Sequence, residues 1–380
     1  MKGFRTRLLL SSIGVLAALS PAAVQAQQYI FTNDNVYQGT GNTPNSATAL
    51  SVNSKGVVKV IGTYTTGAVS SGGGDFAQTQ VASATTTAGS CLFDSNGGNS
   101  TIAAFTIDLK DGHLTAVKGS PFSYGVSGDQ QYGIGLTSGN GELLFAANTQ
   151  FSSISVIKIK PDCSLKAVKS YSVSGTPDGM KVTPNGKFLI VGLLGSVDSF
   201  QINYKKGTMK DLGAVSTQGA AAGVDISCDS STAYFGDAGT NTQVEVFSVS
   251  SAGKLAEINN FTNSNGDNSN NVLLSADEKT LFVSNTMSDQ ITTLSVGSGG
   301  ALTYESSTKL NGSALYALGM ALSANGKDLF VSEDNTPETI GVLVPKGNAV
   351  KEVPKSPFSV INNGGDPPSL TALPVKSCKQ

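Results

Sequence analysis

The sequence predicts an all-β protein, a seven-bladed β-propeller of four-stranded antiparallel blades that its C-terminal strand closes into a ring. Three observations lead to this fold class. Short runs of apolar and β-branched residues alternate with turns rich in Gly, Asn and Ser. An apolar pair recurs at intervals of roughly 45 to 60 residues, close to the period of propeller blades. One further strand pattern remains at the C-terminus, and the first unit lacks one.

The clearest unit holds four predicted strands, at residues 271–276, 281–283, 290–296 and 301–310. Residues 297–300 read Gly-Ser-Gly-Gly and predict a tight turn, because glycine reaches the positive φ values that hairpins need. A small antiparallel sheet of this kind cannot bury both faces alone. The unit therefore needs copies beside it.

Copies of this unit are present along the chain. The pair Leu281-Phe282 has six counterparts, namely Ile30-Phe31, Leu92-Phe93, Leu144-Phe145, Leu189-Ile190, Tyr234-Phe235 and Leu329-Phe330. An Asn-Gly turn precedes the pair at residues 140–141, 185–186 and 325–326, and Asn-Gly is a strong hairpin signal. Seven units result.

The other units place their strands in the same order. The first has strands at 29–33, 46–52 and 57–64, the second at 92–93, 101–107 and 114–117, the third at 144–147, 153–159 and 164–168, the fourth at 180–191, 197–202 and 208–212, the fifth at 223–227, 233–235, 243–249 and 254–258, and the seventh at 318–323, 329–332, 339–344 and 349–353. Residues 65–89 are expected to form a long loop.

The segment at residues 368–374 matches the innermost-strand pattern of residues 180–182 and 319–322. The first unit lacks an innermost strand. We therefore expect the C-terminal segment to pair with the first unit, which closes the ring and removes its open sheet edges.

The first 26 residues have the features of a secretory signal peptide, and residues 27–380 are expected to form a single propeller domain. Lys2, Arg5 and Arg7 give a basic start, residues 8–19 are an apolar core too short to span a bilayer, and residues 24–26 fit the cleavage pattern. No later apolar run reaches about 20 residues, so we expect no membrane span. The expected location is periplasmic or extracellular.

The low net charge bears on which partners the protein can attract. Net charge is -2, charged residues make up 14%, and no basic or acidic block occurs. Nucleic acid and anionic membranes therefore gain no electrostatic support. We expect a monomer whose partner, a small molecule or a protein, binds at the channel face.

Four cysteines in an exported chain predict disulfides, with three possible connectivities. The interpretation as buried or unpaired thiols competes with this one. No CxxC motif occurs, which argues against zinc. Closure of the ring favours a Cys91–Cys378 bridge, because it brings the two segments near one another.

A hydrolase needs a general base or a metal-activated water. His113 is the one histidine of the sequence, and it falls in a hairpin turn on the rim opposite the loops that cover the channel. A Ser-His-Asp set around the channel is therefore excluded. The sequence designates no catalytic residue.

Candidate ligand-binding residues lie in loops predicted on one face of the ring. They are Asp178, Glu333, Asp334, Asp366, Tyr132 and Tyr316. Asp267 is the metal candidate, since Asn263, Asn265 and Asp267 alternate as in a calcium loop, although no glutamate follows. No cofactor is certain, and the oxygen ligands would suit calcium or another divalent cation. Solvated carboxylates and packing tyrosines are the competing interpretation.

The stretches LFVSNTMSDQITTLSV, TPDGMKVTPNGKFLIVG and LFVSEDNTPETIGVL carry a family resemblance. Their pattern resembles the lactonase-like seven-bladed propellers, which include the 6-phosphogluconolactonase and muconate-cyclising types. The resemblance extends over nearly all of residues 27–380. It implies His, Arg and acidic groups over the channel, where the inner strands begin and in the loops after the next strand.

Here the inner strands begin without His or Arg, and residues 192–194 read Gly-Leu-Leu where the family has an acidic group. Glu333-Asp334 keeps a carboxylate in the family position. We therefore expect a lactonase-like propeller that binds a small molecule or a partner at the channel mouth. A lactone hydrolase of the 6-phosphogluconolactonase type, using carboxylates or a bound metal, is the alternative, and a structural or cell-surface interaction module is a third hypothesis.

Overall fold

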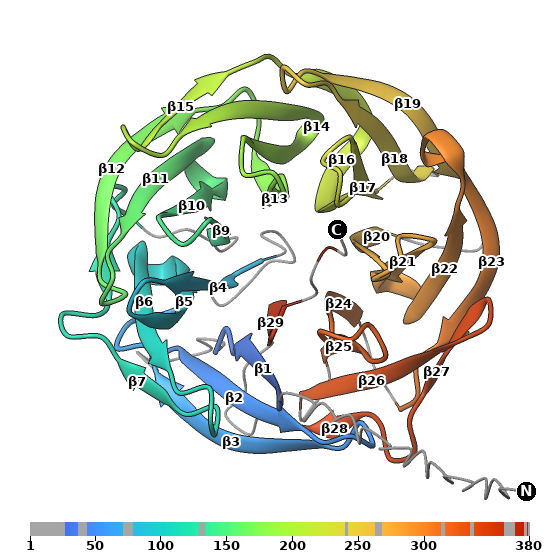
Figure 1. Ribbon diagram of the computed structural model, residues 1–380, viewed down its shortest axis with the longest axis horizontal. Helices are drawn as coiled ribbons and strands as arrows, with labels where there is room; N and C mark the ends of the chain where they lie inside the picture. The colour runs from blue at the N-terminus through green and yellow to red at the C-terminus, as the bar shows by residue number, and fades with distance from the viewer. Residues whose placement is uncertain are drawn as a thin grey trace, which may run out of the picture.

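The structure, a computed structural model, describes residues 27–36, 44–70, 79–128, 134–239, 242–262, 268–312, 316–334, 338–360, 369–375 and 378. Within these ranges the regular structure consists of strands and four short 3-10 helices. The strands form seven blades around a central axis (Figure 1). The predicted signal peptide lies outside the described residues.

From the axis outward, blade 1 consists of β29 (Ser369–Leu373), β1 (Gln28–Asn33), β2 (Ser46–Val52) and β3 (Val58–Thr65). Blade 2 has β4 (Val81–Thr86), β5 (Gly89–Asn96), β6 (Thr101–Ile107) and β7 (Leu114–Ala116), with β8 (Phe122–Ser123) beside β6. Blade 3 has β9 (Ile134–Gly139), β10 (Leu143–Asn148), β11 (Ser153–Ile159) and β12 (Leu165–Ser172).

Blade 4 has β13 (Pro177–Val182), β14 (Phe188–Asn203) and β15 (Thr208–Asp211), and blade 5 has β16 (Val215–Ile226), β17 (Thr232–Ala238), β18 (Thr242–Val249) and β19 (Leu255–Thr262). Blade 6 has β20 (Ser269–Leu274), β21 (Thr280–Asn285), β22 (Gln290–Val296) and β23 (Leu302–Lys309). Blade 7 has β24 (Tyr316–Leu322), β25 (Leu329–Asp334), β26 (Thr339–Lys346) and β27 (Ala349–Glu352), with β28 (Phe358–Ser359) beside β26. The 3-10 helices are η1 (Gly97–Asn99), η2 (Thr149–Phe151), η3 (Thr286–Ser288) and η4 (Ser298–Gly300).

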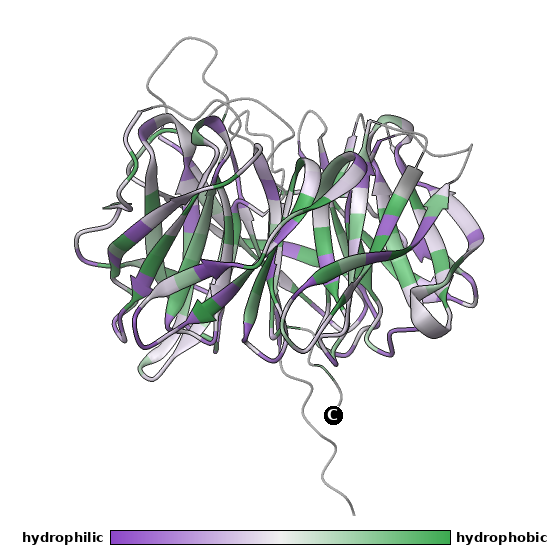
Figure 2. Ribbon diagram, turned by 90° about the horizontal axis from the view of Figure 1, so that it is seen from above, coloured by the Kyte–Doolittle hydropathy of each residue, from purple (hydrophilic) through white to green (hydrophobic). Residues whose placement is uncertain are grey.

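The upper face is defined here as the end of the ring where the second strand of each blade ends and the third begins. The lower face is the opposite end, and Figure 2 shows the ring edge-on. Apolar residues lie along the strands in that view. No helix within the described ranges is long and apolar enough to cross a membrane.

The C-terminal strand completes the first blade, as predicted. β29 pairs antiparallel with β1, with Tyr29 opposite Leu373 and Asn33 opposite Ser369. Blade 7 also packs against blade 1, because Ile30, Leu370 and Phe330 belong to one apolar cluster. Both ends of the chain therefore contribute strands to one sheet.

Blade 4 obtains its four strands from three elements. The first part of β14 pairs with β13, whereas its last part, at Phe200 to Asn203, pairs with β15. The Ile202 amide donates to the carbonyl oxygen of Lys187, so β14 turns back on itself. β14 also pairs with β16, which joins the sheets of blades 4 and 5.

The recurring apolar pair joins each blade to both of its neighbours. Successive side chains of a strand point to opposite faces. Leu281 accordingly packs in a cluster with Tyr234 of blade 5, and Phe282 packs in a cluster with Leu329 of blade 7. Seven such clusters lie between successive blades within the described residues.

The predicted pair Tyr234-Phe235 of blade 5 is wrong by one residue. Tyr234 packs with Val272 of blade 6, and Phe235 packs with Ile190 of blade 4. The counterpart of Leu281-Phe282 is therefore Ala233-Tyr234. The large side chain of Phe235 suggested the wrong register, because the side on which each residue packs cannot be read from its size.

Two inner strands were not predicted. β4 lies inside residues 65–89, which were expected to be a loop, and β9 precedes the third predicted unit. β4 reads VASATT and buries only the small apolar residues Val81, Ala82 and Ala84. Inner strands lie near the axis, where neighbouring blades converge and small side chains suffice. The apolar signal of such a strand is weak.

Four inner strands carry a register shift at similar places near the upper face. The shifts lie at residues 177–180, 221–224, 269–271 and 317–320, in blades 4 to 7. Neighbouring backbones come very close here. A Cβ added at Gly179 would overlap the carbonyl oxygen of Ala222, and a Cβ at Gly223 would lie 2.6 Å from Asn271 Oδ1. Glycine is needed at both positions because the next blade fills the space of a side chain.

Two disulfides join distant parts of the chain, and the predicted Cys91–Cys378 bridge is wrong. Cys91 pairs with Cys163 and Cys228 pairs with Cys378, with Cα atoms 5.6 and 5.3 Å apart. Cys91 lies in β5 and faces blade 3, where Cys163 occupies a turn. The chain beyond β29 continues to blade 5 instead of returning to blade 2.

Removal of the Cys228–Cys378 bridge by serine at both positions should lower the free energy of unfolding by about 2–5 kcal/mol, because the bridge closes a long loop. The sequence separation is 150 residues, compared with 72 for Cys91–Cys163. The measurement is the thermal unfolding midpoint of both double variants. An unchanged midpoint for the Cys228/Cys378 variant would show that the tail is not held by this bridge.

Gly179→Ala should destabilise the ring by about 1–3 kcal/mol, because the added methyl group overpacks two inner strands. Gly297→Ala is the matched control, since its added Cβ would meet Ala301 at an ordinary 3.6 Å. Thermal unfolding of the two variants measures the difference. Equal midpoints would contradict the close approach of blades 4 and 5.

Candidate functional site

A cavity of about 520 Å³ lies at the axis of the ring. The inner strands of blades 1, 4, 5, 6 and 7 line it, together with the C-terminal segment. Its lining residues are mostly aliphatic and comprise Lys181, Val182, Pro184, Asp225, Ile226, Leu273, Met320, Ala321, Leu322, Leu370, Thr371, Ala372, Val375 and Cys378. We call this space the channel cavity.

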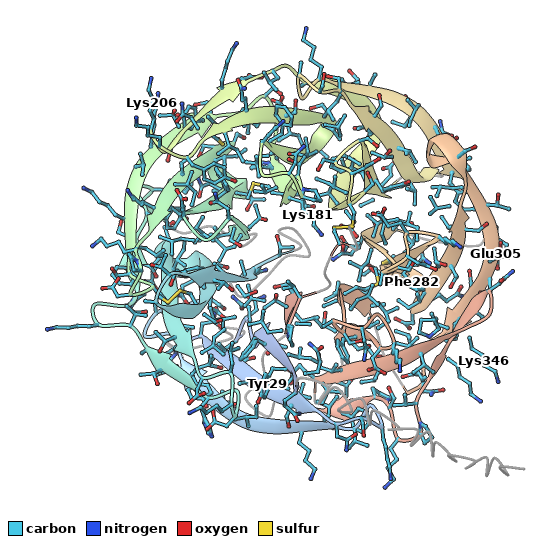
Figure 3. All side chains as sticks on the ribbon, viewed as in Figure 1. Tyr29, Lys181, Lys206, Phe282, Glu305 and Lys346 are labelled. Atoms are coloured by element: carbon cyan, nitrogen blue, oxygen red, sulfur yellow. A yellow bond between two sulfur atoms is a disulfide. The ribbon has the colours of Figure 1, made fainter. Side chains whose placement is uncertain are left out.

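An ion pair is set into the wall of the channel cavity. Lys181 Nζ lies 2.6 Å from Asp225 Oδ1, and the Lys181 side chain is 37% exposed whereas that of Asp225 is 1% exposed. Figure 3 places Lys181 beside the axis of the ring. Within the described ranges no other ion pair between side chains is found. The two charged residues that line the cavity, Lys181 and Asp225, therefore lie side by side.

The backbone holds the Asp225 carboxylate in place. Its Oδ1 atom accepts a hydrogen bond from the Ile226 amide at 2.9 Å, and its Oδ2 atom accepts one from the Leu274 amide at 2.7 Å. These bonds stabilise a buried carboxylate that would otherwise be costly. Among the described residues Asp225 is the partner of Lys181, and an ammonium group has three N–H donors, so Lys181 can donate further hydrogen bonds into the cavity.

Sheet register explains why these two charges meet. Lys181 lies opposite Ile190 and Asp225 lies opposite Tyr234, each of them the second residue of its apolar pair. The two residues therefore occupy the same level of adjacent inner strands. The equivalent residue of blade 6 is Leu273. Blades 4 and 5 thus carry a Lys-Asp pair at the level where blade 6 carries an apolar residue.

Val375 and Cys378, which follow β29 in the chain, also line the cavity. β29 ends at the lower face, and Cys378 is bound to Cys228 of blade 5. Val375 is 56% exposed. An apolar side chain is thus presented beside the lower end of the channel.

The sequence-predicted site residues fall into two groups. Asp178 lies in β13 of blade 4 and is buried. Tyr316 and Glu333 lie in blade 7, where Tyr316 pairs with Asp334 across β24 and β25, and Glu333 pairs with Ala317. The structure thus brings Tyr316, Glu333 and Asp334 together near the upper face and leaves Asp178 on blade 4. Tyr132, Asp267, Asp366 and the side chain of Asp334 lie outside the described residues.

Glu333 occupies a position that recurs among the blades. It lies four residues after the start of the apolar pair, as does Asn285 in blade 6. Asn285 donates to the hydroxyl of Thr292 at 2.7 Å, and Glu333 accepts from the hydroxyl of Thr339 at 3.0 Å. A Cβ at Gly341 would overlap the Glu333 carboxylate, so glycine makes room for it. The carboxylate therefore packs between the strands of its own blade.

Several carboxyl groups are buried near the upper face. Asp34 is fully buried and accepts hydrogen bonds from the hydroxyls of Thr32 and Thr48 at 2.8 Å and of Ser46 at 2.5 Å. Burial nevertheless raises the pKa of Asp34 to about 7. Burial also raises the pKa of Asp94, and the nearby Asp34 charge adds to this effect.

Blade 5 carries another such group. Burial, together with repulsion by the neighbouring Asp237 carboxylate, raises the pKa of Glu245 to about 7. The Gln218 amide donates to Glu245 at 2.8 Å, which opposes the shift. Burial of Asp198 in blade 4 raises the pKa of that carboxyl to about 6. Protonation of these groups is therefore coupled to folding.

His113 is exposed in a hairpin turn on the lower face, as predicted, and its Nδ1 atom lies 2.8 Å from the Tyr64 hydroxyl. Among the described residues no group of three or more His, Cys, Asp and Glu side chains is placed to hold a metal ion. Among the described residues, the Lys181–Asp225 ion pair is therefore the charged group that lines the channel cavity.

Sequence reasoning missed Lys181 and Asp225. A signal was present, because each is a charged residue inside a short inner-strand pattern, MKV and VDI. Their pairing needed the relative register of two blades.

Comparison with known proteins agrees with this architecture. A model of the family Lactonase, 7-bladed beta-propeller, matches residues 193–315 and, in a second alignment, residues 229–342. The matched region runs through β14 to β26, in blades 4 to 7. Blades 4 to 7 are therefore similar to the lactonase seven-bladed propellers. Among curated proteins no sequence matches it.

Solved structures show a similar fold over most of the chain. A protein of Bacteroides fragilis assigned as a 6-phosphogluconolactonase is 19% identical with a TM-score of 0.73, covering 93% of this chain and all 100% of that one. A periplasmic gluconolactonase of Pseudomonas aeruginosa is 18% identical with a TM-score of 0.71, covering 92% and 99%. A Lactobacillus plantarum protein is 14% identical with a TM-score of 0.67, covering 91% and 99%. At these identities the likeness concerns the fold.

Stability should fall as the pH rises from 4 to 8, and Asp34→Asn should weaken this dependence. Because the pKa of Asp34 is raised from 3.8 to about 7, its stabilising contribution is complete below the lower value and is lost as the pH passes the higher one. The loss is on the order of 4 kcal/mol. The measurement is the unfolding midpoint across this pH range.

Asp111→Asn, the same exchange at an exposed turn residue, is the control for the effect of replacing a carboxyl group by an amide. An identical pH dependence for the Asp34→Asn variant and the unaltered protein would contradict the prediction.

Proposed function

We propose that this lactonase-like propeller is exported and binds a small molecule in the channel cavity, where Lys181 donates the orienting hydrogen bond. One observation carries the proposal, namely that the Lys181 side chain, which is 37% exposed, stands in a mostly aliphatic cavity wall. Charged groups are costly in such surroundings. Mostly apolar pockets with a few placed polar groups are typical of small-molecule sites.

Export is supported by two features of the chain. Both disulfides are of the kind that persists in oxidising compartments such as the periplasm or the exterior of the cell. The first 26 residues have the pattern of a signal peptide. A solved structure with this fold is a periplasmic gluconolactonase, which is compatible with such a location.

Lactone hydrolysis is the second candidate function, and the family match favours it. A lactone carbonyl placed at Lys181 would be polarised by the ammonium group, which stabilises the negative charge that develops on the oxygen. A carboxylate or a divalent cation would have to activate the water. Asp178 and Glu333 are the described carboxylates among the predicted site residues.

Binding should depend on Lys181. In a panel of lactones and hydroxy acids followed by isothermal titration calorimetry, we expect at least one compound to bind. Replacing Lys181 by Met in an Asp225→Asn background should weaken that binding about tenfold or more, because a hydrogen bond to a charged donor is lost. The background substitution avoids leaving the buried carboxylate without its cation.

Asp225→Asn alone and Lys187→Met are the controls for this experiment. Lys187 is exposed in the turn before β14, outside the cavity, and its substitution should leave binding unchanged. Failure of every compound to bind, or equal affinity after loss of Lys181, would refute the proposed site.

Hydrolysis is tested separately by pH-stat assays on the same lactones, with and without a chelator. If the second candidate is correct, turnover should be measurable and should fall at least about tenfold in Glu333→Gln or Asp178→Asn. Binding without turnover by the unaltered protein would exclude hydrolysis of these compounds and leave the binding function in place.

A further inference from the structure

The channel cavity has a chemical asymmetry that restricts its ligand. Blades 4, 6 and 7 and the C-terminal strand contribute aliphatic side chains, of which Val182, Leu273, Met320 and Leu370 belong to four different strands. Val182 and Leu273 are half-buried. Apart from the ion pair, Thr371 contributes the one hydroxyl among the lining residues. The aliphatic side chains of the described lining therefore share the cavity with one charged pair, Lys181 and Asp225.

Resting on the proposed function, we infer that the ligand is a neutral aliphatic carbonyl compound. Its carbonyl oxygen accepts a hydrogen bond from Lys181 Nζ, and its hydrocarbon chain lies on the aliphatic wall. The ammonium group has three N–H donors, and one of them is directed at Asp225. Burial of the hydrocarbon chain supplies most of the affinity, and the hydrogen bond fixes the orientation.

The Asp225 carboxylate argues against an anionic ligand. It lies 2.6 Å from Lys181 Nζ, so a second carboxylate on the same ammonium group would come close to a like charge. That charge is fixed, because backbone amides hold both oxygens of Asp225. Repulsion then cancels part of the attraction, and the ligand must also lose the hydration of its charge. A carbonyl group bears neither cost.

Polar groups are few among the described lining residues, which argues against a polyhydroxylated ligand such as a sugar lactone. Each hydroxyl that enters the cavity gives up hydrogen bonds to water and needs a protein partner in exchange. Thr371 Oγ1 already lies 3.5 Å from Ser83 Oγ. Most hydroxyls of a sugar would therefore face aliphatic carbon.

Three probes of graded chemistry test the inference by ligand-observed NMR and calorimetry. They are γ-nonanolactone, which is neutral and aliphatic, nonanoate, which has a similar chain and a charge, and D-glucono-δ-lactone, which is neutral and polyhydroxylated. We expect γ-nonanolactone to bind about tenfold or more tightly than either of the others. NMR also shows whether the lactone remains intact during the measurement.

Two variants, each altering a different part of the cavity, test whether the ligand binds there. Lys181→Met with Asp225→Asn should weaken γ-nonanolactone binding about tenfold by loss of the donor, and Leu273→Gln should weaken it similarly by loss of apolar wall. Lys187→Met should change nothing. If the double variant does not fold, Leu273→Gln alone still decides whether the apolar wall is used.

The outcomes separate the inference from the proposed function. Tighter binding of D-glucono-δ-lactone or nonanoate, dependent on Lys181, overturns the inferred ligand class and leaves the proposed site standing. Binding of γ-nonanolactone that neither variant weakens places it elsewhere and overturns both. Failure of all three probes, together with failure of the wider panel, also overturns both.

Discussion

Packing between neighbouring blades is the interaction on which this structure depends. Each second strand presents two successive apolar residues to opposite sides, and Leu281 and Phe282 thereby join blade 6 to blades 5 and 7. A four-stranded sheet gains little stability alone, so every blade is held by the two beside it. The same rule joins the last blade to the first, through Phe330 and Ile30. The pairing of β29 with β1 adds main-chain hydrogen bonds at that junction.

Convergence of the blades on the axis sets the character of the channel. Inner strands have little space, as shown by Gly179 and Gly223, where the neighbouring backbone occupies the position of a side chain. A long charged side chain in this layer is therefore unusual, and Lys181 is accommodated because Asp225 lies at the same level of the next strand. Function is proposed at this pair because packing alone does not require it. An apolar residue serves at the same level in blade 6, where Leu273 stands.

Buried polar groups at the upper ends of the second strands connect strands within one blade. Asn285 and Glu333 both bind a hydroxyl of the third strand in their own blade. Asp34 takes this place in blade 1, and burial raises the pKa of its carboxyl group to about 7. Carboxylates that sequence patterns associate with a site can thus serve the connection between two strands. Their chemistry has to be judged from their partners in the structure.

The sequence by itself determined the all-β class, the number of blades and the use of the C-terminal strand, because apolar pairs and Asn-Gly turns are local signals that repeat. It also located the exposed turn of His113. Only the tertiary structure decided the register of Ala233-Tyr234, the small inner strands β4 and β9, and the bridges Cys91–Cys163 and Cys228–Cys378. These features depend on which residues of different blades lie at the same level. The Lys181–Asp225 pair belongs with them, since its two residues are 44 positions apart and meet because adjacent inner strands align.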